Sequence, residues 1–93
     1  MNGQETAETL ALQAVSWLIG QSELIPRFFE ATGATVDDLA GLVRDPVFLG
    51  AVLDFLLTED ALVMAFCDAS GLAYDRPMQA RAQLPGGPGP HWT

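Results

Sequence analysis

Residues 45–57 read DPVFLGAVLDFLL and contain the longest apolar run of the chain. Asp45 suits an N-cap, and Pro46 suits the first helical turn, where the amide that proline lacks would have no partner. The 11 residues from Val47 to Leu57 would rise about 16 Å as a helix, roughly half of the apolar thickness of a bilayer. We therefore expect a helix that is buried inside a protein and does not span a membrane.

Glycine, proline and capping residues divide the rest of the chain into further pieces of helical length. With the segment above as the fourth of six, the other expected helices cover about residues 5–19, 22–33, 36–44, 58–71 and 75–84. The sixth helix has only Met78 and Leu84 as large apolar residues. We therefore expect it to fray first.

Several residues are of the type that begins or ends a helix. Gly20 suits a left-handed C-cap, because glycine adopts that conformation without steric cost. Thr35 followed by Asp38 is a variant of the capping box, and Thr58 with two acids behind it suits an N-cap. These residues predict where the first helix ends and where the third and fifth begin.

The sequence also contains an internal repeat, because residues 15–37 align with residues 53–75 when the chain is moved by 38 positions. The identical pairs are Leu18 with Leu56, Leu24 with Leu62, Phe28 with Phe66, Ala31 with Ala69, Gly33 with Gly71 and Asp37 with Asp75. A unit of this size cannot bury its apolar face alone, so two copies should pack about a pseudo-twofold axis. Apolar helices separated by glycines would also align in this way by chance, and that alternative stays open.

The chain is acidic, with a formal net charge of −8, and its four basic side chains are all arginines. Nucleic acids and anionic membranes require clustered basic residues, so neither is expected as a partner, whereas a basic protein remains open. Cys67 is the only cysteine, which excludes an intrachain disulfide. Residues 1–8 lack the basic and apolar parts of a secretory signal. We therefore expect a cytoplasmic protein.

Asp54 and Cys67 are the residues whose chemistry would suit a catalyst. Asp54 interrupts an apolar helix, and a buried carboxylate without a partner has the raised pKa of a functional acid. Its counterpart in the repeat is Ser16, so we expect Asp54 to lie on an exposed polar stripe or to cap a neighbouring helix. A nucleophilic Cys67 would need a base or a positive field. Its counterpart is Phe29, so we expect a buried structural cysteine.

No cofactor or metal ion is expected. One cysteine and one histidine cannot supply the usual nitrogen and sulfur ligands, and the carboxylates do not follow the spacing of a calcium loop. His91 and Trp92 follow a Pro-Gly segment that cannot pack by itself, so Trp92 is either a frayed end or an aromatic anchor that docks on this domain or on a partner. We assign residues 1–85 to a single helical domain and residues 86–93 to a Pro/Gly-rich tail.

Several segments together are similar to a known family. They are LALQAVSWL at residues 10–18, ELIPRF at 23–28, DPVFL at 45–49, VLDFLL at 52–57 and ASG at 69–71. In combination they resemble the alphaproteobacterial family called domain of unknown function 3572. The resemblance implies a bacterial cytoplasmic protein with no assigned activity, and it therefore implies no catalytic or binding residue.

The expected fold is all-α: a small bundle of five to six helices, built from two tandem helical repeats. The expected function is a non-enzymatic protein-protein interaction or adaptor module, because catalytic groups are lacking and the surface is acidic. His91 and Trp92 are its candidate contact residues. Two alternatives remain open: a small enzyme that uses Asp54 or Cys67, and a structural homo-oligomer such as a homodimer.

Overall fold

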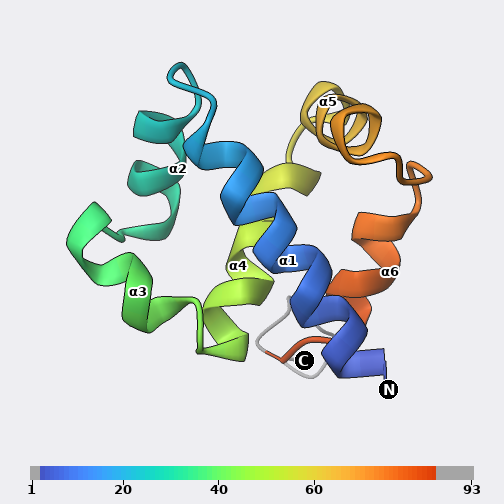
Figure 1. Cartoon of the computed structure of the whole chain (residues 1–93), viewed down its shortest axis with the longest axis horizontal. Coiled ribbons are helices and arrows are strands. Elements are labelled where there is room, and N and C mark those ends of the chain that lie inside the picture. Colours follow the sequence, from blue (N-terminus) through green and yellow to red (C-terminus); the bar gives the residue numbers. More distant parts are fainter. Residues whose placement is uncertain (1–2, 86–93) are drawn as a thin grey trace, which may run out of the picture.

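A computed structural model describes residues 3–85, and within them every regular element is a helix. The elements are α1 (Gly3–Ile19), α2 (Ile25–Thr32), the 3-10 turn η1 (Val36–Asp38), α3 (Leu39–Leu42), α4 (Pro46–Leu57), α5 (Asp60–Ser70) and α6 (Arg76–Ala82). The prediction of an all-helical bundle is confirmed. Figure 1 shows α1 crossing α4, with α2 and α3 on one side of the crossing and α5 and α6 on the other.

Helix α4 lies at the centre of the bundle and contacts α1, α2, α5 and α6. Asp45 caps it as predicted, because its side chain accepts a hydrogen bond of 2.9 Å from the amide of Val47. Its most buried residues, Val52, Leu53 and Leu56, are fully excluded from solvent. The long apolar run is therefore buried by other helices, and each of these side chains contributes about 1.5–3 kcal/mol.

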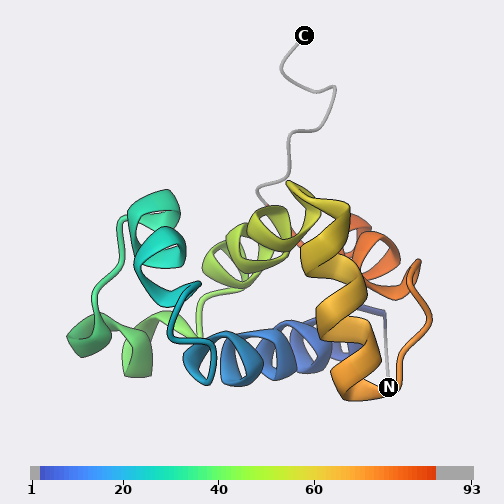
Figure 2. The same cartoon turned by 90° about the horizontal axis from the view of Figure 1, so that it is seen from above.

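Helix α1 forms the second layer of the bundle, on the opposite side from α4 (Figure 2). Its buried residues recur with helical spacing: Ala7, Leu10, Ala11, Ala14, Val15 and Leu18. Half of them are alanines. Small side chains on one face allow two helices to approach closely. The remaining faces of α1 are polar or exposed, so the helix buries one stripe only.

Aromatic side chains fill the space between α2 and α4. The ring of Phe28 lies 5.5 Å from that of Phe55 and 6.2 Å from that of Phe48, in both cases edge to face. On the other side of the bundle, Trp17 and Phe66 are 5.8 Å apart. These rings belong to the core, as their helical spacing predicts.

Three of the predicted caps are wrong. Gly20 does not take the left-handed conformation, since α1 ends in a tighter turn in which the amide of Gly20 donates to the carbonyl of Trp17. Thr35 donates to the carboxylate of Asp38 at 3.0 Å, so neither side chain caps a backbone amide. Thr58 donates to the carbonyl of Phe55 and thereby ends α4, while Glu59 becomes the N-cap residue of α5.

Helix α6 packs against both α1 and α4, although it is short. Leu84 is buried as expected, but Met78 is 61% exposed and does not anchor the helix. The side chains that hold α6 in place are instead Pro77, Ala80 and Arg81. The sixth helix was predicted correctly, but its weak apolar pattern did not indicate that small residues and an arginine hold it in place.

The two aligned segments share one local feature and differ in another. Gly33 and Gly71 each follow a helix with a left-handed backbone, at φ of 75° and 71°. By contrast, α6 packs on α1 and α4, whereas the main contact of α3 is with the adjoining η1. The glycines act alike at the ends of α2 and α5, and the duplication itself stays a prediction.

We predict that Gly33→Ala and Gly71→Ala each lower the free energy of unfolding by about 1 kcal/mol, because an alanine is strained at positive φ. Gly41→Ala is the matched control, since Gly41 has a negative φ and a methyl group on its Cα would enter open space. It should raise the free energy of unfolding by about 0.5 kcal/mol through helix propensity. Chemical denaturation measures all three, and equal effects at Gly33 and Gly41 would contradict the assignment.

Candidate functional site

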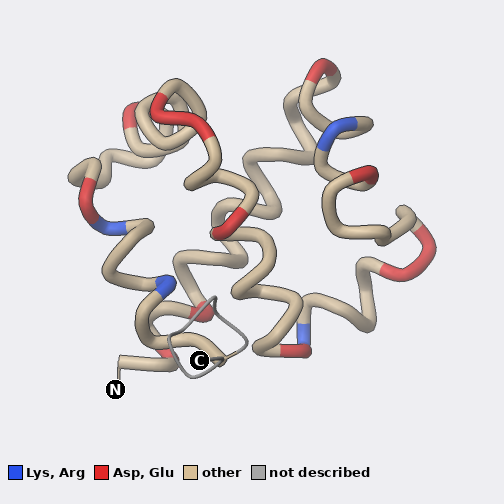
Figure 3. Tube along the Cα trace, turned by 180° about the vertical axis from the view of Figure 1, so that it is seen from behind, with Lys and Arg blue, Asp and Glu red and all other residues tan. Residues whose placement is uncertain are grey.

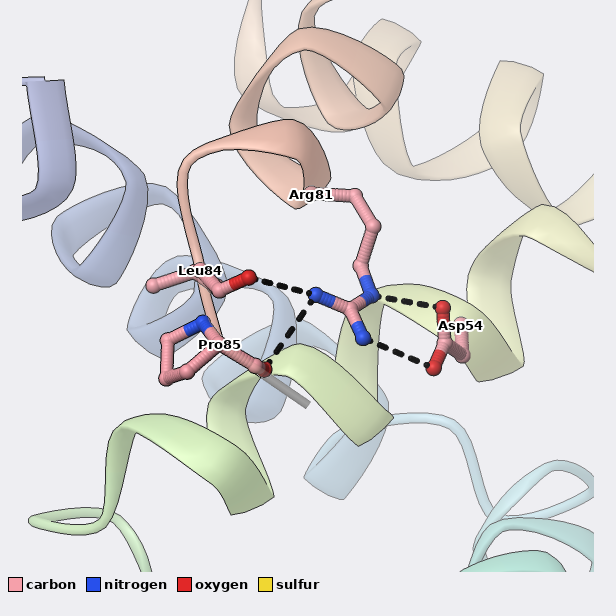
Figure 4. Close-up of polar contacts among 4 residues, drawn as sticks. All are labelled: Asp54, Arg81, Leu84 and Pro85. Carbon is pink, nitrogen blue, oxygen red and sulfur yellow. Dashed lines mark hydrogen bonds and ion pairs between the residues drawn. The ribbon is translucent and has the colours of Figure 1, made fainter. Parts of the chain in front are cut away.

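Arg81 is the most buried charged residue in the described part of the chain, with 7% of it exposed. Its guanidinium binds Asp54 through two parallel hydrogen bonds, Nε to Oδ1 at 2.7 Å and Nη2 to Oδ2 at 3.3 Å. Its Nη1 donates to the carbonyls of Leu84 and Pro85 at 3.1 and 3.4 Å (Figure 4). One side chain thus joins α6, α4 and the chain that leaves α6.

Gly50 provides the space for this guanidinium. A Cβ at Gly50 would lie 3.0 Å from the Cζ and Nη1 atoms of Arg81 and 3.0 Å from the carbonyl oxygen of Pro85. Gly50 lies one helical turn before Asp54, so both residues face α6. The glycine in the apolar run is therefore a packing requirement of the ion pair.

The side chain of Asp54 is 45% exposed and lies on one edge of the apolar helix. The sequence predicted an exposed polar stripe or a cap, and the exposed edge agrees with the first alternative. The partner was missed, because the residues on either side of Asp54 do not reveal which arginine approaches it. Beside Asp54, a small hollow of about 270 Å³ is lined in part by Thr32 and Thr58. Their hydroxyls already donate to backbone carbonyls.

Cys67 is fully buried in α5, as predicted. Its thiol donates to the carbonyl of Ala73 at 3.4 Å. Burial raises the pKa of Cys67, and the nearby charges of Asp68 and Asp75 raise it further. These effects favour the protonated thiol, which is the weaker nucleophile.

A first surface depression, which we call the notch, lies between the end of α2, η1, α3 and the start of α4. It has a volume of about 370 Å³ and is lined by Thr32, Gly33, Ala34, Asp38, Gly41, Leu42 and Phe48. Its floor is apolar, its edge carries Asp38, and Gly41 contributes no side chain. Two strongly exposed apolar residues belong to the same elements, Val36 in η1 and Val47 in α4.

A second depression, which we call the groove, lies between the first half of α1 and α6. It has a volume of about 520 Å³. Helix α1 contributes Gly3, Thr6, Ala7 and Leu10, and α6 with its C-cap residue contributes Arg76, Gln79, Ala80 and Gln83. Both sets follow the spacing of one helical face. The sequence did not single out this region, because the two sets are about 70 positions apart and only tertiary packing joins them.

A metal site would require several ligands close together. Between residues 3 and 85, no group of three or more His, Cys, Asp and Glu side chains could hold a metal ion. In the same range, no helix combines the length and the apolar character needed to cross a bilayer. His91 and Trp92, the predicted contact residues for a protein partner, lie outside the described residues.

These observations define a small helical domain with an ion pair between a buried arginine and a half-exposed aspartate, a buried thiol and three surface depressions. The chain belongs to the family described as "Protein of unknown function (DUF3572)", which matches residues 4–87. The family resemblance read from the sequence is thereby confirmed. No curated protein and no solved structure matches the chain.

We predict that Asp54→Ala lowers the free energy of unfolding by about 1–2 kcal/mol, because it removes the carboxylate from a buried guanidinium, while water that reaches the half-exposed Asp54 position replaces part of the interaction. Arg81→Met should recover part of this loss in the double variant, since an apolar side chain then occupies the site. A double-mutant cycle by urea denaturation measures the coupling. Strictly additive effects would show that the ion pair does not stabilise the fold.

Gly50→Ala provides an independent check of the same geometry. It should destabilise the wild-type chain by about 1–3 kcal/mol, because the new methyl group meets the guanidinium and a backbone carbonyl. In the Arg81→Met background the cost should be smaller, since a flexible thioether can move aside. An equal loss of stability in both backgrounds would show that the new methyl group does not clash with the guanidinium of Arg81.

We also predict a pH effect from Cys67. Its pKa is higher in the folded than in the unfolded chain, so the protonated thiol stabilises the folded state. This contribution to the free energy of unfolding is complete below the pKa of the unfolded thiol and decreases as pH rises above it. The free energy of unfolding should therefore fall above about pH 9, and less steeply in Cys67→Ala. The matched control is Tyr74→Phe, because the raised pKa of Tyr74 acts only at higher pH. Identical slopes in wild type and Cys67→Ala would contradict this assignment.

Proposed function

We propose that this protein is a non-enzymatic interaction module, an adaptor that binds a segment of another protein. The observation that carries the proposal is the notch, because it combines an apolar floor, an acidic edge and a glycine that opens it. The floor consists of Ala34, Leu42 and Phe48. Such a site suits a single apolar side chain that projects from a partner.

The chemistry of the partner follows from charge. Between Gly33 and Phe48 the chain has three acids, Asp37, Asp38 and Asp45, and a single basic residue, Arg44. Figure 3 shows few basic positions among many acidic ones. A partner segment with an apolar residue between lysines or arginines would match this surface in shape and in charge.

The two catalytic candidates have other roles in the fold, which also supports an adaptor. The carboxylate of Asp54 accepts two hydrogen bonds from Arg81. Cys67 is buried and its pKa is raised. An enzyme that used either residue would first have to release it from these contacts.

The duplication, the compartment and the terminal aromatic residues belong to the same proposal. Two diverged copies of one helical unit would explain why Gly33 and Gly71 both end helices in the left-handed conformation. The reduced, buried thiol of Cys67 suits a cytoplasmic protein. His91 and Trp92 would provide a second contact with the partner.

The test is capture from an extract of the organism that encodes the chain, using immobilised wild-type protein and variants of the notch. Gly41→Leu fills the notch, and Asp38→Asn removes the charge at its edge. Both should lose the same captured protein, with affinity reduced about tenfold or more for the purified pair. Glu23→Gln is the control, because it removes an exposed negative charge from outside the notch.

Thermal unfolding of each variant ensures that a loss of capture does not reflect a loss of fold. A partner captured equally by wild type and Gly41→Leu would exclude the notch, and no specific capture would contradict the adaptor function. Removal of residues 86–93 tests the terminal contact separately. If the chain instead forms a homodimer, sedimentation will show it without any partner.

A further inference from the structure

The groove between α1 and α6 differs from the rest of this acidic chain, because none of the residues that line it is Asp or Glu. Its charged residue is Arg76, at the first position of α6. The lining therefore carries one positive charge and no negative charge, although the carboxylate of Asp75 lies just outside it. The guanidinium of Arg76 is the group of this lining that can pair with an anion.

Arg76 is also available for binding. Two arginines of the chain pair with carboxylates, Arg27 with Glu59 and Arg81 with Asp54. Within residues 3–85, the guanidinium of Arg76 has no hydrogen bond or ion pair to another side chain. The residue is half-buried at the groove, which limits the competition of water for its hydrogen bonds.

The other residues of the groove define the ligand further. Gln79 and Gln83 follow Arg76 on the same face of α6, and each has an amide that can donate to an oxygen. The Gln79 amide donates one of its two N–H groups to the carboxylate of Asp75 at 3.0 Å, which leaves the other N–H for a ligand. Opposite and beneath them lie Ala7, Leu10 and Ala80, which are buried and apolar.

We propose that the groove binds a small amphiphilic carboxylate. Its carboxylate would pair with the guanidinium of Arg76, assisted by the amide of Gln79, and its apolar chain would lie on the alanines and on Leu10. The volume of about 520 Å³ is within the range of small-molecule sites. The two helical turns that line it span about 11 Å, which suits an acid with a short apolar chain. This site is independent of the notch.

Sodium octanoate is a suitable probe, and 1-octanol is its neutral counterpart of equal chain length. In ¹⁵N spectra of the full chain, octanoate should shift the amides of α1 and α6 along the groove, with saturation near 1 mM. Octanol should produce no saturable shift at the same concentration, because it cannot pair with Arg76. The amides that line the notch should not move.

Two variants test the roles of individual residues. Arg76→Gln should weaken octanoate binding about tenfold or more, because it removes the charge-assisted hydrogen bonds. Gln79→Glu should weaken it as well, by placing a negative charge beside the ligand. The matched controls are Arg44→Gln and Gln13→Glu, which make the same changes outside the groove and should bind octanoate as the wild type does.

Thermal unfolding shows whether each variant keeps its fold. If Arg76→Gln does not fold, Gln79→Glu still tests the site. Equal binding of octanol, equal affinity in Arg76→Gln and Arg44→Gln, or shifts confined to the notch would each overturn the proposal. Because the notch variants leave the groove intact, failure of the adaptor proposal would not affect this test.

Discussion

A guanidinium that leaves water must retain hydrogen-bond acceptors, and the arrangement of α4 and α6 follows from this requirement at Arg81. Four hydrogen bonds connect it to Asp54, Leu84 and Pro85. The carboxylate must therefore face α6, the helix must carry glycine one turn earlier, and the chain after α6 must turn back toward α4. No buried side-chain nitrogen or oxygen in residues 3–85 lacks a partner. The ion pair thus adds a directional constraint to the packing of α6 on α1 and α4.

Much of the fold could be predicted from local signals. The apolar run of α4 and its cap at Asp45 follow from short-range rules, and the structure confirms both. The caps that failed depended on a choice between neighbours: the hydroxyl of Thr35 found a carboxylate, and that of Thr58 found a carbonyl. Such choices depend on the angle at which the chain enters the helix, which tertiary packing sets. Tertiary packing also sets which face of α6 turns toward the core, and for this reason Met78 was mistaken for an anchor.

The candidate sites were less accessible to sequence reasoning. Cys67 could be placed in the core, because its counterpart in the repeat is apolar and no base is near it in the sequence. The partner of Asp54 could not be named, since it lies on a helix 27 positions away. The notch and the groove depend on the packing of separate helices. For two of these sites a glycine was the best available signal in the sequence: Gly50 marks the ion pair, and Gly41 marks the notch.

The contact of α6 with the beginning of α1 has a consequence for how the molecule forms. These two helices stand at opposite ends of the described chain, so the loop that their contact closes includes almost every other element. A nascent chain on the ribosome that has completed α5 would still expose the alanine stripe of α1 and one flank of α4. Arg81 is synthesised after all of its neighbours on α4, so α6 cannot dock on them before almost the whole described chain has been made. Until then, a chaperone would find here the apolar surface that α6 later covers.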